Sequence, residues 1–271
     1  MNIIWPGDTA LPTTDRGLAY GDGVFETIRM QANGGVLLHS HIARMMAGAA
    51  VLGIPVSEPD LRDVIRQACG QAHEPEGWVL KLILTRGVGG RGYRPSGDMI
   101  PNLIVSTGSL PPCPDHGGVS VAVSKVPLMV NPYLAGVKTL NRLEQVLASQ
   151  DLTDDVYEMI MANLAGDLVE GTRTNLLVRT DDCWLTPPTG QLAVAGIMRD
   201  HVVRTLAENG ERVEQRAIAP GILHSAECRG MYLMNSLIGV VPVRKITGRD
   251  LPVDNSLATI FNPLDLLESQ V

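Results

Sequence analysis

The spacing of apolar positions divides the N-terminal part of the chain into alternating strands and amphipathic helices. Runs rich in β-branched residues predict the strands, and apolar residues three or four positions apart predict the helices. The expected strands are 23–31, 34–39, 78–85 and 102–107, and the expected helices are 40–53 and 57–72. Ser40 and Ser57 are candidate N-caps, and Gly53 is a candidate helix end. Turn residues at 33–35 predict a hairpin between the first two strands.

The rest of the chain has more and shorter apolar runs, which predict a strand-rich second domain. Its expected strands are 119–126, 156–162, 168–180, 183–188, 212–218, 230–236 and 240–246, and its expected helices are 141–150, 196–210 and a short one that closes the chain. Pro and Gly are frequent in 111–118, which is typical of a linker. The sequence therefore predicts an α+β protein with two domains, 1–110 and 119–271.

Composition narrows the choice of ligands. A formal net charge of −7 disfavours nucleic acid as the main partner. The apolar runs are shorter than the roughly 20 residues of a membrane span, and no secretion signal is visible, so we expect a cytoplasmic protein without a membrane partner. The four cysteines are far apart, which argues against a metal site. Only four of the 22 basic residues are lysines. Because arginine binds carboxylate and phosphate groups with two parallel hydrogen bonds, we expect small anionic ligands.

The segment 87–92 reads G-V-G-G-R-G and matches the G-x-G-x-x-G pattern of dinucleotide-binding loops. Such a loop must open a helix, because the helix N-terminus carries the pyrophosphate. Here the glycines lead into 93–97, where a proline and a glycine disfavour a first helical turn. A nucleotide-binding protein therefore stays an alternative, and a loop that binds other anions is the preferred interpretation.

Lys138 differs from the other lysines in its position. It follows a loop that contains Pro and Gly, and it precedes the expected helix at 141–150. A lysine there is either a surface charge or a Schiff-base lysine, which needs a rigid approach to a carbonyl group. Glu170 ends a mainly apolar strand, and a buried carboxylate needs a cation. That cation is either an arginine or the ring nitrogen of pyridoxal phosphate.

Three further places are candidates for binding a phosphate group. Arg44 lies on the first expected helix. Gly196 precedes another helix, so the free N–H groups of Ile197 and Met198 point out of its start. Ser236 offers a hydroxyl group at the end of a strand. Each has an ordinary alternative, as a surface arginine, a loop glycine or a capping serine.

Together these segments resemble the fold-type IV pyridoxal-phosphate enzymes, which include branched-chain and D-amino acid aminotransferases and aminodeoxychorismate lyases. The matching segments are DRGLAYGDGVFETIR, LHSHIARM, GVKTLNRLEQVLA, DLVEGTRTNLLV, AGIMR and MNSLIGVVPV, in the family's order and over nearly the whole chain. The resemblance implies a fold like that of D-amino acid aminotransferase, pyridoxal 5'-phosphate as cofactor, and a homodimer with active sites near the subunit interface.

The resemblance also implies roles for the candidate residues. Lys138 carries the cofactor, and Glu170 contacts its pyridine nitrogen. The phosphate is expected to contact Arg44, Gly196, Ile197, Met198 and Ser236. Thr27, which is close to the opening motif, is a candidate hydroxyl donor in catalysis. No metal ion is implied.

Within this family, TRGVGGRGYRP and NPYLAGVKTLNRLEQ are most similar to the aminodeoxychorismate lyases. Such enzymes release 4-aminobenzoate, a folate precursor, and pyruvate from a substrate with two carboxylates. Arg91 is the first candidate for binding a carboxylate; Arg29 and Arg86 are further candidates, with structural ion pairs as their alternative. An aminotransferase for D-amino or branched-chain amino acids stays open, as does a silent binding module. Leu143, however, stands where branched-chain enzymes usually carry tyrosine.

Overall fold

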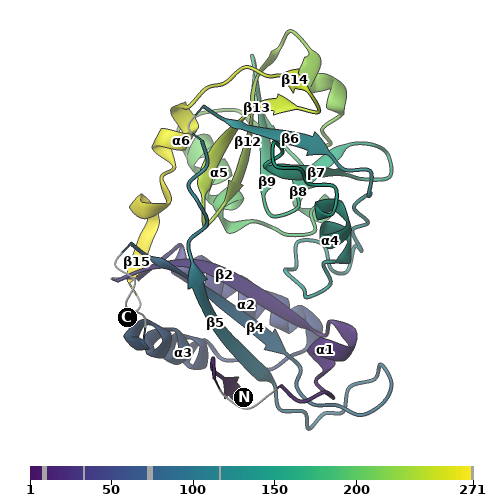
Figure 1. Ribbon diagram of the computed structural model, residues 1–271, viewed down its shortest axis with the longest axis vertical. Coiled ribbons are helices and arrows are strands. Elements are labelled where there is room, and N and C mark those ends of the chain that lie inside the picture. The colour runs from purple at the N-terminus through teal and green to yellow at the C-terminus, as the bar shows by residue number, and fades with distance from the viewer. Residues whose placement is uncertain (8–10, 33, 72–75, 116, 270–271) are drawn as a thin grey trace. The chain divides into compact units, whose positions relative to one another are not determined.

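The structure is a computed structural model that describes residues 1–7, 11–32, 34–71, 76–115 and 117–269. It forms two compact units (Figure 1). The first comprises Met1–Pro111, Val137–Asn141 and Leu266–Val271, and the second comprises Pro112–Gly136 and Arg142–Asp265. This division differs from the predicted domains at two places. The segment that carries Lys138 and the end of the chain both belong to the first unit, because both pair with its strands.

The first unit is a six-stranded sheet with helices on one face (Figure 1). The strand order is β1 (Asn2–Ile4), β5 (Asn102–Ser109), β4 (Trp78–Thr85), β2 (Gly23–Gln31), β3 (Gly34–Val36) and β15 (Leu267–Ser269), and the helices are α1 (Arg16–Tyr20), α2 (Leu38–Leu52) and α3 (Glu58–Gln71). Alternate residues of β2 and β4 pack with α2 and α3 in one apolar core. The predicted limits of 23–31 and 78–85 are confirmed, because alternation defines strands that are buried on one face.

The helix limits show which signals are local. Gly53 ends α2 in a left-handed conformation with φ 66°, and the Ser57 hydroxyl accepts the Asp60 N–H in the first turn of α3, as expected. The prediction of Ser40 as an N-cap is wrong, because α2 begins two residues earlier. Its start is stabilised instead by Glu268, whose carboxylate accepts the His39 N–H at 2.6 Å. The described part of the predicted hairpin pairs β2 with β3, while Asn33 lies outside the described residues.

The second unit is a nine-stranded sheet that closes on itself like a barrel. The order is β11 (Val213–Gln215), β10 (Trp184–Thr186), β9 (Asn175–Thr180), β12 (Cys228–Asn235), β13 (Gly239–Ile246), β6 (Val119–Val123), β7 (Glu158–Ala162) and β8 (Leu168–Gly171), with β14 (Arg249–Asp250) beside β13. Closure comes from β8 and β9, which pair through Glu170 and Asn175. α4 (Leu143–Ser149) contacts β7, and α5 (Ile197–Glu208) contacts β12.

Two predictions for this unit need correction. The expected strand 168–180 is two strands, because the fully buried Glu158 carboxylate accepts the N–H groups of Arg173 and Thr174 and holds a turn between them. The last described element is not the expected short helix: α6 (Ser256–Ile260) is followed by β15, which pairs with β3 of the first unit. Among the described helices, none is long and apolar enough to cross a membrane.

Candidate active site

The backbone of Lys138 is held against β2 of the first unit. The Phe25 N–H donates to the Lys138 carbonyl oxygen at 3.0 Å, and the Leu140 N–H donates to the Gly23 carbonyl oxygen at 3.0 Å. The Lys138 ammonium nitrogen lies 4.2 Å from the centre of the Phe25 ring, within the range of a cation–π contact. This anchoring gives Lys138 the rigid approach that a cofactor-bearing lysine needs.

One face of β2 collects cationic groups around Phe25. Phe25, Thr27 and Arg29 alternate with the buried residues of β2, so they share the face turned away from α2 and α3. Thr27 pairs with Lys81 of β4, whose ammonium nitrogen lies 5.6 Å from the Phe25 ring centre. We call the face formed by Phe25, Thr27, Arg29, Lys81 and Lys138 the cationic face. The structure thus brings three predicted site residues, Thr27, Arg29 and Lys138, to one surface, where an anionic ligand is favoured.

A buried ion cluster of Glu26, His41 and Arg44 occupies the other face of β2. The Arg44 Nε and Nη2 atoms each lie 2.7 Å from a Glu26 carboxylate oxygen, and the His41 Nδ1 atom lies 2.5 Å from Oε2. Burial raises the pKa of Glu26, but the charge of Arg44 and the contact with His41 outweigh it, so this pKa lies far below its ordinary value. Burial also lowers the pKa of His41, more than Glu26 raises it. His41 is therefore neutral and donates its Nδ1 proton to an ionised Glu26.

This cluster changes what was expected of Arg44. From the sequence, Arg44 was expected to contact a phosphate or solvent, whereas the structure pairs it with Glu26 and leaves 15% of its side chain exposed. Glu26 and His41 were not identified from the sequence. The signal for Glu26 was its register, because it alternates with Val24 and Ile28 on the buried face of β2. A carboxylate at such a position requires a cation nearby.

Arg86 has structural partners instead of an open carboxylate site. Its guanidinium donates to the Asp22 carboxylate at 2.7 and 3.0 Å and to the carbonyl oxygens of Leu52 and Gly53 at 2.6 and 3.0 Å. These contacts tie the end of α2 to the start of β2. The structure therefore favours the ion-pair alternative for Arg86 over substrate binding.

The glycine-rich segment forms an exposed loop between β4 and β5. It passes through bends without opening a helix, which confirms that the helical context of a dinucleotide site is missing. Gly87 has φ +93°, and a Cβ there would lie 1.9 Å from the Ile100 carbonyl oxygen, so the glycine serves a tight turn. Arg91 is exposed, and none of the described residues pairs with its guanidinium. It is available to an external anion.

In the second unit, the Glu170 carboxylate is buried and fixed by backbone donors. Its Oε2 atom accepts the N–H groups of Ala193 and Val194 at 3.1 and 3.2 Å. Asn175, which pairs with Glu170 across the sheet, donates to the Val194 carbonyl oxygen at 3.0 Å. The two hydrogen bonds from Ala193 and Val194 fix the orientation of the Glu170 carboxylate. The arrangement fits a residue that faces a protonated ring nitrogen.

The start of α5 fits a phosphate group. A Cβ on Gly196 would lie 1.8 Å from the Asn175 Oδ1 atom, so only glycine is accommodated between Asn175 and α5. Within the described chain, no side chain caps this helix, and its first N–H groups include those of Ile197 and Met198. Helix N-termini of this kind bind phosphate oxygens.

Arg199, which was not among the residues predicted from the sequence, anchors this helix start. Its side chain is 1% exposed, and its guanidinium donates to the Pro187 carbonyl oxygen at 2.8 Å and to the Gln215 side-chain oxygen at 3.1 Å. The only local sequence signal for this role of Arg199 was its position two residues after Ile197. The start of α5 is thereby fixed to the end of β10.

Ser236 lies in the turn between β12 and β13. It was expected to end the strand 230–236, but β12 ends one residue before it. The Asn235 side-chain oxygen accepts the N–H groups of Leu237 and Ile238 at 2.9 and 3.0 Å. This side-chain turn holds Ser236, which is 8% exposed, in one orientation.

Three comparisons with known proteins give the family. The family model "Amino-transferase class IV" matches residues 23–246 of this chain. The chain belongs to the class IV aminotransferase family. It is 34% identical over 252 residues to an aminodeoxychorismate lyase from Vibrio harveyi, covering 91% of each chain. It is 31% identical over 249 residues to a putative branched-chain-amino-acid aminotransferase from Methanocaldococcus jannaschii, covering 89% of this chain and 84% of the relative.

Among solved structures, the 4-amino-4-deoxychorismate lyase from Pseudomonas aeruginosa has a TM-score of 0.87 and 34% identity, covering 93% of this chain and 94% of that chain. The fold-type IV class expected from the resemblance is therefore confirmed, and so is the α+β composition.

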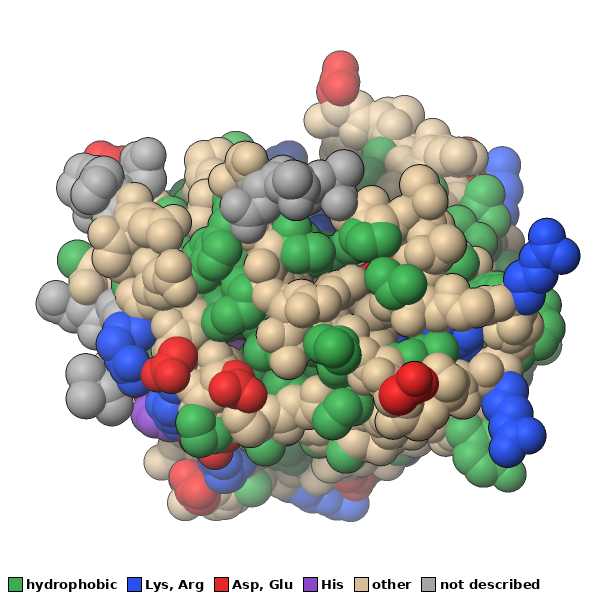
Figure 2. Space-filling view, turned by 90° about the horizontal axis from the view of Figure 1, so that it is seen from below, with side chains coloured by type: hydrophobic (Ala, Val, Ile, Leu, Met, Phe, Trp, Pro, Cys, Tyr) green, Lys and Arg blue, Asp and Glu red, His purple; other side chains and the backbone are tan. Residues whose placement is uncertain are grey.

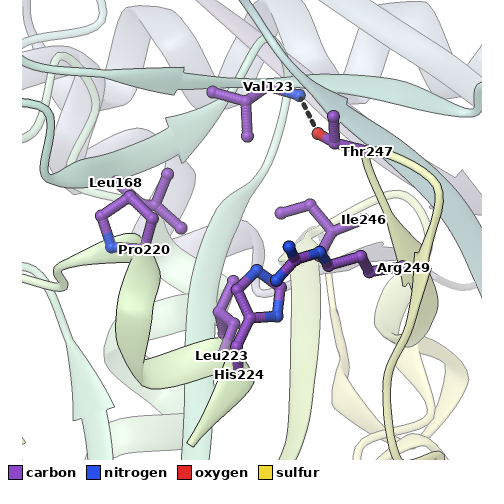
Figure 3. A pocket seen from close by; sticks show the side chains of 8 residues that line it. All are labelled: Val123, Leu168, Pro220, Leu223, His224, Ile246, Thr247 and Arg249. Carbon is purple, nitrogen blue, oxygen red and sulfur yellow. Dashed lines mark hydrogen bonds between the residues drawn. The ribbon is translucent and has the colours of Figure 1, made fainter.

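A cavity in the second unit is separate from these residues. Its volume is about 160 Å³, and it lies where β6 and β13 end, beside the 3-10 helix Pro220–His224 (Figure 3). It is lined by Val123, Leu168, Pro220, Leu223, His224, Ile246, Thr247 and Arg249. None of the predicted site residues lines this cavity. The described residues also contain no group of three or more His, Cys, Asp or Glu side chains placed to hold a metal ion.

Figure 2 shows one face of the molecule, on which Lys and Arg side chains stand singly near the edges and apolar side chains lie between them. This face is not a continuous basic surface of the kind that binds a polyanion.

Proposed function

We propose that this protein is a pyridoxal 5'-phosphate-dependent aminodeoxychorismate lyase, which converts 4-amino-4-deoxychorismate to 4-aminobenzoate and pyruvate. The observation that carries the proposal is the 34% identity to lyases of this type in both the sequence and the structure comparisons. The residues described above supply a set of groups that fits this cofactor and a dicarboxylate substrate.

The resemblance to the fold-type IV enzymes supplies the cofactor residues of this proposal. Lys138 would hold the cofactor through its aldehyde, and the Glu170 carboxylate would keep a proton on the pyridine nitrogen. The phosphate is bound by Arg44, Gly196, Ile197, Met198 and Ser236. When bound, the cofactor withdraws electrons from the carbon that carries the substrate's amino group.

Lys138 has a second role as a base. The free amine of Lys138 would remove the proton from C4 of the substrate. The bond between C3 and the enolpyruvyl oxygen then breaks, and the leaving group takes up a proton and becomes pyruvate. Thr27 lies on the cationic face and is the candidate hydroxyl group for that proton transfer. Because the ring becomes aromatic, the elimination is effectively one-way.

Arg91 and Arg29 bind the substrate carboxylates in this proposal. Arg91 is exposed on its loop, and Arg29 shares the cationic face with Lys138. Arg86 is left out because its hydrogen bonds go to Asp22 and to the end of α2. We further propose that the enzyme works as a homodimer in the cytoplasm, in the synthesis of the folate precursor 4-aminobenzoate.

The test is to mix purified, cofactor-loaded protein with 4-amino-4-deoxychorismate and to measure both products. We expect equal amounts of 4-aminobenzoate and pyruvate, and loss of both in Lys138→Ala. Lys125→Ala is the matched control, because Lys125 is an exposed lysine outside the site, and it should keep the activity. A yellow, cofactor-loaded wild-type protein that releases neither product would overturn the proposal.

The second candidate is a branched-chain or D-amino acid aminotransferase. It is favoured by the 31% identity to the putative branched-chain enzyme. In this case a branched-chain or D-amino acid would transfer its amino group to the cofactor and shift the absorption of the protein without any second substrate. Under the lyase proposal, this shift is slow relative to the release of 4-aminobenzoate.

A further inference from the structure

The outer part of the glycine-rich loop, 90–97, is hydrogen-bonded to the rest of the first unit through one buried arginine. Residues 91–98 are all exposed, and the Tyr93 side chain has 83% of its surface accessible. Among the described residues, Arg16 supplies both hydrogen bonds that link 90–97 to another part of the chain. Its Nη1 donates to the Gly92 carbonyl oxygen at 3.0 Å, and its Nη2 donates to the Tyr93 carbonyl oxygen at 2.8 Å.

Arg16 is itself held rigidly. It is 3% exposed, and its Nε donates to the Asp22 carboxylate at 2.8 Å. Its guanidinium carbon lies 4.8 Å from the centre of the Tyr20 ring, which also contacts the Tyr93 ring at 5.5 Å between centroids. A planar guanidinium with three fixed acceptors is pre-organised, so it transfers the position of α1 to the loop.

The loop is shaped to receive this side chain. A Cβ on Gly89 would lie 2.7 Å from the Arg16 Cδ atom, whereas a Cβ on Gly90 would meet no atom within 4 Å. Backbone hydrogen bonds from Arg16 to Gly87 and from Gly89 to Thr14 fix the near end of the loop. Arg91 thus lies between two tethers that both depend on the segment 14–16.

We propose that Arg16 is a positioning residue that fixes the glycine-rich loop and, through it, Arg91 for binding a substrate carboxylate. The second half of this statement rests on the proposed lyase function, and the first half does not. Arg16 touches neither Lys138 nor the other residues of the cationic face in any contact described above. Its loss should therefore weaken substrate binding more than it slows the chemical step.

The role of Arg16 in holding the loop is tested by chymotrypsin cleavage of the native, cofactor-loaded protein. Arg16 holds the carbonyl group of the bond that chymotrypsin cleaves after Tyr93, while Tyr133, which is 89% exposed, is an internal reference. We expect Arg16→Met to raise cleavage at Tyr93 relative to Tyr133 by about ten-fold, because cleavage follows the population of the open loop. Arg16→Lys should give a smaller rise. An unchanged ratio in Arg16→Met overturns the proposal.

A second pair of variants keeps Arg16 and disturbs the loop. Gly89→Ala pushes against the Arg16 side chain and should raise the same ratio, and Gly90→Ala is the matched control that should not. Equal ratios in the two glycine variants contradict the tether even where Arg16→Met folds poorly.

The role of Arg16 in substrate binding is tested by steady-state kinetics with aminodeoxychorismate. We expect Arg16→Met to raise KM by roughly ten-fold with kcat within about two-fold, and Arg91→Met to add little in the double variant, because both act on one contact. A lower kcat at unchanged KM, or additive effects, would contradict the role of Arg16. If the wild type makes no 4-aminobenzoate, the lyase proposal fails, while the cleavage ratio still decides whether Arg16 holds the loop.

Discussion

Glu26 and Glu170 are both buried carboxylates, with 1% and 3% of their surface exposed, but the hydrogen bonds described for them differ in kind. Both oxygens of Glu26 contact the cationic Arg44, and His41 adds a hydrogen bond. Glu170 is held by the neutral N–H groups of Ala193 and Val194. A carboxylate neutralised by a side-chain cation orients that cation. Backbone amides fix a carboxylate without adding a full positive charge, which suits a residue that faces a cationic ring.

The largest effect is expected from Glu26→Gln. This change leaves the Arg44 guanidinium without its carboxylate at a mostly buried position, and removing one partner of a buried pair costs about 3–5 kcal/mol. The free energy of unfolding, measured by urea denaturation, should fall by that order. Glu268→Gln is the control, because its pair with His39 is exposed and should contribute less than about 1 kcal/mol. Equal losses in the two variants would show that the cluster is no more important than a surface pair.

Glu170→Gln should separate function from stability. Its amide oxygen can still accept the N–H groups of Ala193 and Val194, so the melting temperature should change little. The carboxylate charge is lost, and we expect kcat for 4-aminobenzoate release to fall by about a hundred-fold or more, the order found when one preorganised electrostatic contact is removed. Full activity in Glu170→Gln would place this residue with Glu26 as a structural carboxylate.

Gly196→Ala tests the surroundings of Glu170 without touching its charge. The new Cβ would overlap the Asn175 side chain, which holds the Val194 backbone, at a cost of about 1–3 kcal/mol. We expect affinity for pyridoxal 5'-phosphate, titrated by absorbance, to fall about ten-fold or more. Gly190→Ala, where a Cβ meets no atom within 4 Å, should bind the cofactor like the wild type.

The smallest expected effect is a pH dependence that belongs to the Glu26 cluster. His41 has a lowered pKa in the folded protein, so the unfolded chain binds the extra proton first as the pH falls through the ordinary value of 6.5. Stability is therefore complete above this pH and is lost below it, by at most about 1.4 kcal/mol per pH unit. His41→Asn, which can still donate to Glu26, should lose this slope when unfolding is measured at pH 7.5 and 5.5. A slope that persists in the variant would assign it to other groups.

The strands and helices with strong periodicity could be predicted from the sequence. The contacts between segments that are distant in the sequence could not. β2 and β4 have the predicted limits because burial of alternate residues is written locally. The start of α2 is stabilised by Glu268, which lies more than 200 positions away in the sequence. The pairing of β15 with β3 also joins segments that are far apart in the sequence. No local pattern around Ser40 contains that information.

The sequence by itself determined the order of most elements and the segments that resemble the family, because these depend on residue type and short-range spacing. Lys138, Glu170, Gly196 and Ser236 are candidates that the resemblance supplies. Only the tertiary structure decided the polar partners: Asp22 for Arg86, the carbonyl groups of Gly92 and Tyr93 for Arg16, and Glu26 for Arg44. The physical reason is that a buried charge must find an opposite charge or a dipole in space. From the sequence alone, many arginines in this chain could be the partner of a given carboxylate. The packing of distant segments determined which arginine pairs with which group.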